Sequence, residues 1–273
     1  MQAMARQCWA KSLSECSDRM SGEHLVTKAL FPGGYTIRGF PWCATEFKTV
    51  GVNALTANIL CRGHNTTLSP LDAAAKDVWC VLRYIWDLNA LRQAEAAAGI
   101  RNRRSRVKFR LDGAGFERWA FKTMVNMVAS GSVTGFAKDW EPPRDLARYI
   151  VEGGALPEGS GLGLAVVIGE KVSDQDYISF ALLRREDRPV DDPEAEGFLM
   201  GFRGLRLAGS STRPLRSLHR PVNLVNPEQV MLRPQRLELL PSGEATFDWS
   251  GTYSNGTDKN VVRARKKYDS ARL

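Results

Sequence analysis

Apolar spacing predicts one long helix in the first half of the chain. From Leu71 to Leu88, apolar side chains recur at intervals of three and four residues, the period of a buried helix face. Ser69-Pro70 fits a helix start, since proline is tolerated in the first turn, and Gly99 fits the residue after the last turn. Shorter stripes of the same kind predict two further helices, at 114–128 and 144–151.

Beyond Gly154 the helical spacing gives way to short apolar or alternating runs between Gly, Pro and Asp turns. These runs predict strands at 162–168, 177–183, 198–207, 229–240 and 245–249. The sequence therefore predicts an α+β protein with four parts. We expect an N-terminal module at 1–72, a helical connector at 73–153, a β-rich domain of unknown role at 154–258, and a basic tail at 259–273 with too little apolar content to pack.

Composition narrows the class of protein. A hydrophobic content of 43% is normal for a globular chain that builds a core without disulfides. No run approaches the roughly 18 consecutive apolar residues of a membrane span, so we expect no membrane partner. The N-terminus lacks the apolar run and small-residue cleavage site of a secretory signal, so we expect a cytoplasmic protein.

Charge favours a polyanionic partner such as nucleic acid, because the formal net charge is +8. Within 101–110, Arg104, Arg106, Lys108 and Arg110 alternate and would lie on one face of an extended strand. Such a row of cations can follow a phosphate backbone, so we expect these four residues to bind nucleic acid. A solvated strand edge protected by its charges is the alternative.

Cysteine usage suggests a metal site near the N-terminus. The chain has five cysteines, and in a reducing compartment spaced cysteines are metal ligands more often than disulfides. Structural zinc takes four N or S ligands, and a Cys-x-x-His pair at a helix start supplies two of them. We therefore predict a zinc site formed by Cys8, Cys16, Cys61 and His64, with Cys43 as a substitute ligand. In the alternative, the cysteines are small buried apolar residues and His64 is a loop histidine.

The same region resembles a known family. Ser21-Gly22-Glu23-His24-Leu25-Val26 is followed by Cys61-x-x-His64-Asn65 and by Leu68-Ser69-Pro70-Leu71-Asp72. Together, these motifs resemble the HNH endonuclease superfamily, which has the ββα-metal fold. The resemblance covers residues 8–72. It departs from the usual pattern in that His64 replaces the second Cys of the helix element, and no Lys follows Asn65.

The resemblance implies roles for individual residues. It makes His24 the general base that activates water, and it makes Glu23 and Asn65 the ligands of a catalytic divalent cation. Their hard oxygen atoms suit Mg²⁺ or Mn²⁺. Asp72 is a weaker candidate for the metal shell or for helix capping, and Asn58 and Asn53 compete for the middle position of the motif.

Two functions follow. The first is a metal-dependent endonuclease that hydrolyses the phosphodiester bonds of nucleic acid, with DNA favoured by the resemblance alone. The second is a catalytically inactive zinc-stabilised module that binds nucleic acid or protein. A third hypothesis makes the β-rich C-terminal domain the functional centre, as a sensor of a ligand or partner that regulates the nuclease, and a partner protein or a second copy of the chain is a candidate to bind there.

Overall fold

The computed structural model describes residues 7–269 except 18, 32–33, 39, 41–42, 101–104, 134–135, 137–139, 166–177, 185–194, 204, 212–229, 234, 241 and 254–257. It is a mixed α+β structure. The helices are α1 (Arg62–Ala97), α2 (Gly113–Ala129), α3 (Arg144–Glu152) and α4 (Lys259–Asp269), with 3-10 turns at Lys28–Leu30 and Val52–Leu55. The strands are β1 (Met20–His24), β2 (Tyr35–Arg38), β3 (Lys48–Val50), β4 (Thr56–Cys61), β5 (Val107–Asp112), β6 (Gly161–Ala165), β7 (Ile178–Arg184), β8 (Ala195–Phe202), β9 (Leu205–Ser210), β10 (Val230–Leu232), β11 (Arg236–Leu240) and β12 (Gly243–Asp248).

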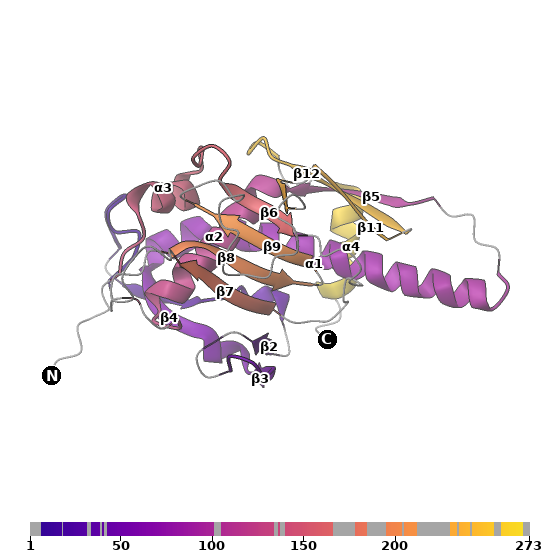
Figure 1. Ribbon diagram of the computed structural model, residues 1–273, viewed down its shortest axis with the longest axis horizontal. Coiled ribbons are helices and arrows are strands. Elements are labelled where there is room, and N and C mark those ends of the chain that lie inside the picture. The colour runs from indigo at the N-terminus through magenta and orange to yellow at the C-terminus, as the bar shows by residue number, and fades with distance from the viewer. Residues whose placement is uncertain are drawn as a thin grey trace.

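The largest sheet has seven strands in the order β10-β6-β9-β8-β7-β2-β3. Figure 1 shows α1 and α2 running behind this sheet. The two layers meet through aromatic side chains, since Phe121 of α2 packs edge-on against Phe198 of β8 with ring centroids 5.4 Å apart. Neighbouring strands of this sheet are antiparallel except for β2 and β7, which are parallel. Because β2 and β3 come from the first half of the chain, strands from both halves share one layer.

A second sheet, with strand order β11-β12-β5, lies on α1. Phe109 of β5 contacts Tyr84 of α1 with ring centroids 5.7 Å apart. The approach of β12 to the helix requires glycine, because a Cβ at Gly243 would lie 2.5 Å from Cγ1 of Ile85. Strand β5 pairs in parallel with β12, so a strand of the predicted connector completes a sheet of the predicted C-terminal domain.

The N-terminal region contains two strands followed directly by a helix. Strands β1 and β4 pair antiparallel, and α1 begins immediately after β4. The strands β2 and β3 are inserted between the two and belong to the seven-stranded sheet. Buried apolar residues from all of these regions form one continuous core. The pairing therefore crosses the boundaries of the predicted parts 1–72, 73–153 and 154–258.

The long helix was predicted correctly at its end and wrongly at its start. Gly99 has φ 76°, and the N–H groups of Gly99 and Ile100 donate to the carbonyls of Ala96 and Glu95, which closes the helix. The predicted start at Ser69 is wrong, because Cys61 is the N-cap and α1 begins at Arg62. Pro70 therefore lies inside the helix, where it cannot donate to a carbonyl one turn earlier.

Other predictions have mixed outcomes. The helices predicted at 114–128 and 144–151 are confirmed as α2 and α3. The single strand predicted at 198–207 is two strands, because the chain turns at Arg203, where φ is 46°. Within the described residues, no helix is both long enough and apolar enough to span a membrane.

The prediction that the tail does not pack is wrong, because residues 259–269 form α4. Its Val261 and Ala264 are fully buried, and α4 lies against α1. Arg265 makes two hydrogen bonds of 2.7 Å to the carboxylate of Asp77 in α1. The low apolar content is sufficient because the buried Val261 and Ala264 and the bidentate Arg265–Asp77 ion pair hold the helix in place.

Candidate zinc centre

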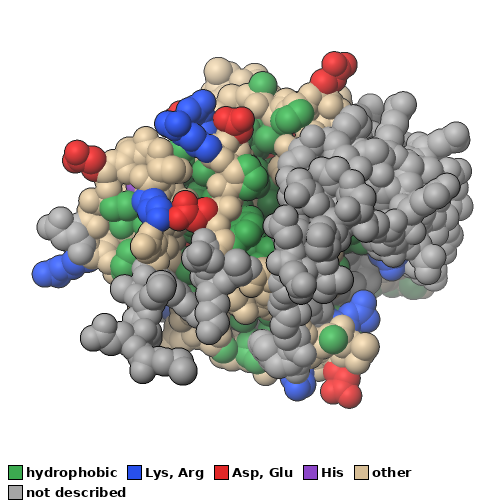
Figure 2. All heavy atoms as spheres, turned by 60° about the vertical axis from the view of Figure 1, so that its left-hand side comes forward, with side chains coloured by type: hydrophobic (Ala, Val, Ile, Leu, Met, Phe, Trp, Pro, Cys, Tyr) green, Lys and Arg blue, Asp and Glu red, His purple; other side chains and the backbone are tan. Residues whose placement is uncertain are grey.

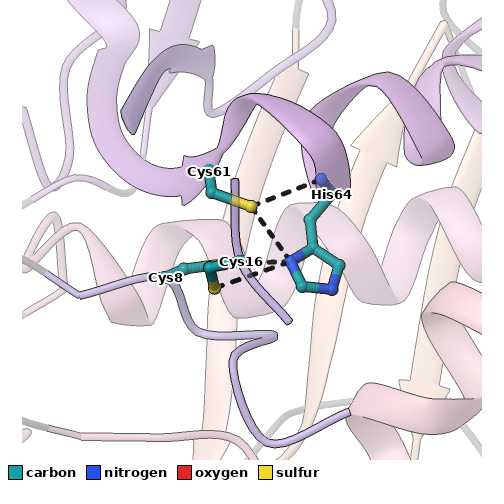
Figure 3. A group of neighbouring side chains, drawn as sticks. All are labelled: Cys8, Cys16, Cys61 and His64. Carbon is teal, nitrogen blue, oxygen red and sulfur yellow. Dashed lines mark hydrogen bonds between the residues drawn. The ribbon is translucent and has the colours of Figure 1, made fainter. Parts of the chain in front are cut away.

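Three cysteines and one histidine converge where α1 begins. Cys61 ends β4 and His64 lies in the first turn of α1, while Cys8 and Cys16 come from the segment before β1. Their ligand atoms all lie within 4.8 Å of one another. Figure 3 shows the sulfur atoms gathered around one edge of the imidazole ring. The convergence favours one shared site over the alternative of separately packed cysteines, and His64 lies in α1 rather than in a loop.

The distances suit a zinc ion. Nδ1 of His64 lies 3.1 Å from Sγ of Cys61, 3.4 Å from Sγ of Cys8 and 3.9 Å from Sγ of Cys16. A tetrahedral zinc with Zn–S bonds of about 2.3 Å and Zn–N bonds of about 2.0 Å separates sulfur from nitrogen by about 3.5 Å. The three distances lie on both sides of that value. A Cys₃His group in this arrangement could hold a metal such as zinc.

Backbone hydrogen bonds bring the two halves of this cluster together. The N–H of Trp9 donates to the carbonyl of Ile59 at 3.0 Å, which lays the N-terminal segment beside β4. Tight turns follow, with the N–H of Lys11 bonded to the carbonyl of Cys8 at 3.1 Å. Cys8 and Cys16 can therefore share one site although seven residues separate them.

A second layer of contacts orients the ligands. Oγ of Ser14 lies 2.9 Å from Nε2 of His64, so we assign the ring proton to Nε2 and leave Nδ1 to face the sulfur atoms. The N–H of Gly63 donates to Oγ of Ser17 at 3.0 Å. Neither serine was predicted from the sequence, because no spacing rule identifies the residues behind a metal ligand.

The three thiols differ in acidity. Burial raises the pKa of Cys61, but hydrogen bonds from the backbone of His64 and from Ser17 outweigh it and lower the value to about 6. Burial raises the pKa of Cys8, and it raises the pKa of Cys16 to about 12. Cys61 is therefore the thiolate that offers a cation its first ligand at neutral pH.

The remaining cysteines lie elsewhere. Cys43 is buried with its Sγ 4.0 Å from the carbonyl of Ile37, so the structure does not place this substitute ligand in the cluster. Cys80 is buried within α1.

Glu23, a predicted ligand of the catalytic cation, lies in a buried ion-pair network. Oε1 of Glu23 is 2.7 Å from Nζ of Lys122, which is only 2% exposed. The same ammonium group lies 3.0 Å from both carboxylate oxygens of Asp72, and Nδ2 of Asn126 donates to Glu23 at 3.2 Å. Burial alone would lower the pKa of Lys122, but Asp72 and Glu23 raise it, which keeps the ammonium charged. We call Glu23, Asp72, Lys122 and Asn126 the Lys122 cluster.

His24 and Asn65 have other surroundings. Nδ2 of Asn65 donates to Oγ of Ser21 at 2.8 Å, whereas Glu23 contacts Lys122 and Asn126. The two predicted ligands of the catalytic cation therefore have different hydrogen-bond partners. His24 is half-buried opposite Thr56, and its buried Nε2 has no hydrogen-bond partner among the described residues. Burial lowers the pKa of His24, so the imidazole is neutral at pH 7. The same strand pair bears an open hollow lined by Gly22, Thr56, Ala57 and Asn58. The catalytic roles of His24, Glu23 and Asn65 stay predictions.

The basic strand has the predicted alternation. Lys108 and Arg110 are exposed on one face of β5, while Phe109 and Leu111 are buried on the other. Arg106 lies just before the strand, and Arg104 lies outside the described residues. Arg110 forms an ion pair with Asp248. The binding of nucleic acid by these residues stays a prediction.

No protein family, curated protein or solved structure with which the chain was compared matches it. The chemistry of the site therefore rests on its own residues.

Proposed function

We propose that this chain is a zinc-stabilised protein that binds nucleic acid. Its zinc would join the N-terminal segment to β4 and α1 through Cys8, Cys16, Cys61 and His64. The observation that carries the zinc proposal is the convergence of these four donor atoms within 4.8 Å. The partner is proposed from the net charge of +8. A reducing cytoplasm is the setting in which such thiols act as metal ligands.

The donor set favours a structural rather than a catalytic zinc. Catalytic zinc sites keep one position for water or substrate, whereas four protein ligands fill a tetrahedral site. Ser14 behind His64 adds the kind of second contact that fixes a ligand ring.

The Lys122 cluster favours binding over catalysis. The Lys122 ammonium lies between Glu23 and Asp72 and already supplies a positive charge to both. A divalent cation held by Glu23 would have to displace this ammonium or lie against a like charge, which costs free energy in a buried place. Glu23 is therefore better suited to hold Lys122 than to hold Mg²⁺ or Mn²⁺.

The endonuclease is the second candidate, and His24 favours it. A half-buried imidazole that is neutral at pH 7, with an unpartnered Nε2, has the properties of a general base. In this alternative, His24 activates water for phosphodiester hydrolysis, most readily of DNA, and the divalent cation is held by Glu23 and Asn65.

One plasmid experiment separates the two candidates. Purified protein is assayed for zinc, then mixed with supercoiled plasmid in Mg²⁺ or Mn²⁺, and the products are separated with and without removal of protein. Retarded but uncut plasmid supports the binding function. Cleavage by wild type and not by folded, zinc-loaded His24→Ala supports the endonuclease instead. Protein that contains no zinc overturns the zinc site, and plasmid that is neither retarded nor cut overturns both functions.

A further inference from the structure

All exposed side chains of β5 and α4 are basic. In the strand, the exposed side chains are Lys108 and Arg110. In the helix, every exposed side chain is again Lys or Arg, namely Lys259, Arg263, Lys266 and Lys267. We call these six residues the β5–α4 surface.

Direct contacts place the strand and the helix side by side. Nδ2 of Asn260 donates to the carbonyl of Lys108 at 2.9 Å, and the N–H of Arg110 donates to Oδ2 of Asp258 at 2.8 Å. The hydroxyl of Tyr253 donates to the carbonyl of Arg110. These side chains occupy the free edge of β5, so the start of α4 lies against the strand that carries Lys108 and Arg110.

The orientation of α4 is fixed by its buried side. Val261 and Ala264 are buried, and the Arg265–Asp77 ion pair ties the same side of the helix to α1. Lys259, Arg263 and Lys267 are spaced by four residues and lie on one face of the helix, opposite that side. This face extends about 12 Å at a rise of 1.5 Å per residue.

Much of the nearby acidic charge is already engaged. Asp87 accepts from Lys267 and Tyr268, Asp248 pairs with Arg110, and Asp258 accepts backbone N–H groups. Among the residues that the structure describes, Lys108, Lys259 and Arg263 form no ion pair. The surface therefore has positive charge left for an external anion.

Helix stability accounts for Lys266 and Lys267 in the last turn of α4 but not for the cations nearer its start. Lys259 lies in the first turn of α4, where the helix dipole disfavours positive charge, and the first turn holds no acidic residue. The pairs Lys259–Arg263 and Arg263–Lys267 place like charges four residues apart, which also disfavours the helix. An external anion would relieve both effects.

We infer that the β5–α4 surface binds the phosphate backbone of double-stranded DNA without reading its sequence. Basic side chains alone are sufficient to bind a phosphate backbone. A protein interface or a membrane-surface helix would add aromatic or apolar anchors, and the exposed positions of β5 and α4 contain none. The face shown in Figure 2 has a different charge pattern from the β5–α4 surface. On its described part, basic and acidic side chains lie next to one another. This inference rests on the proposed nucleic-acid binding and assigns it a place.

The test neutralises three cations in the full-length, zinc-loaded protein. The surface variant is Lys108→Gln, Lys259→Gln and Arg263→Gln, which leaves the buried side of α4 unchanged. The matched control is Lys28→Gln, Arg62→Gln and Arg144→Gln, three exposed cations on other elements, so both variants lose the same formal charge. Fluorescence anisotropy of a labelled DNA duplex gives the dissociation constant over a range of salt concentrations.

We expect the surface variant to bind at least about tenfold more weakly, with the slope of log affinity against log salt reduced in magnitude by up to about 2.7, or 0.9 for each lost phosphate contact. The control should keep the wild-type slope. Equal losses in both variants, or a larger loss in the control, would overturn the inference while leaving nucleic-acid binding intact. Tighter binding to phosphatidylserine vesicles than to DNA would overturn it in favour of a membrane surface. No DNA binding by wild type would overturn the proposed function as well.

Discussion

Two polar clusters join the N-terminal region to the first turns of α1, and they obtain positive charge in different ways. The first cluster consists of the three thiols and the imidazole of Cys8, Cys16, Cys61 and His64, so its positive charge would come from a bound metal. The Lys122 cluster contains two carboxylates, and α2 supplies the ammonium between them. Both are held by contacts between residues far apart in the sequence, so either could anchor the N-terminal region.

Because of this difference, different treatments should disrupt the two clusters. A metal bound by Cys8, Cys16, Cys61 and His64 would be exchangeable with the solution, so chelators and acid would dissociate it while the covalent chain is unchanged. The Lys122 cluster receives its positive charge from the chain itself, so a chelator cannot remove it. The stability of the first cluster would therefore depend on a bound metal, and that of the second does not.

The largest expected effect comes from removing a zinc ligand. Cys61→Ser should lose bound zinc and lower the unfolding temperature by more than about 10 °C, since structural zinc contributes several kcal/mol to folding. Metal analysis and thermal unfolding measure both quantities. Cys43→Ala, at a buried cysteine outside the cluster, should keep its zinc. A zinc-loaded Cys61→Ser protein would show that the ligand set is wrong.

The next effect comes from removing the internal cation. Lys122→Met leaves the buried Glu23 carboxylate without its partner and should lower the free energy of unfolding by about 3–5 kcal/mol. Urea denaturation at saturating zinc measures it, and the zinc content should not change. Adding Glu23→Gln should restore part of the loss, because it removes the unpaired charge. If the single variant is as stable as wild type, the ion pair contributes nothing.

A smaller effect separates the affinity for zinc from the stability of the fold. Ser14→Ala removes the hydrogen bond to Nε2 of His64 and should weaken zinc binding by about 10–100-fold. Competition with a chromophoric chelator gives the affinity, and unfolding at saturating zinc should be nearly unchanged. Ser12→Ala, two residues earlier in the same segment, is the matched control. Equal zinc affinity in both variants would remove Ser14 from the site.

The smallest effect concerns pH and His24. Burial holds the pKa of His24 below its usual value, so the unfolded chain takes up a proton before the folded protein does as the pH falls through about 6.5. Protonation of His24 should therefore reduce stability as the pH falls, by less than about 1 kcal/mol between pH 7.5 and 6. His24→Gln should show a flatter dependence in urea denaturation at saturating zinc. A steeper dependence in the variant would contradict the sign.

The sequence predicted the convergence of Cys8, Cys16, Cys61 and His64, because metal ligands are recognised by residue type and order. The amphipathic helices α2 and α3 were predictable for a similar reason, since their apolar periodicity is local. The start of α1 was not, because the cap formed by Cys61 extends the helix backward across the Pro70 signal.

Contacts between distant residues account for what the sequence did not reveal. The Arg265–Asp77 pair spans 188 positions, so local composition could not show that the tail forms a packed helix. Lys122 meets Glu23 and Asp72 only after folding, although a lysine among the apolar residues of α2 could have indicated a buried partner. The predicted role of Glu23 came from its neighbour His24, whereas its actual contacts come from α2.

The parallel pairing of β5 with β12 has a consequence for synthesis of the chain on the ribosome. Strand β5 (Val107–Asp112) emerges first, and β12 (Gly243–Asp248) and the edge-covering Asp258 and Asn260 follow only after a long intervening stretch of chain. At typical elongation rates, the strand waits on the order of ten seconds without a partner. Positive charges on a strand disfavour its pairing with another chain. The charges of Lys108 and Arg110 would therefore disfavour aggregation of the nascent chain until its own partner strand arrives.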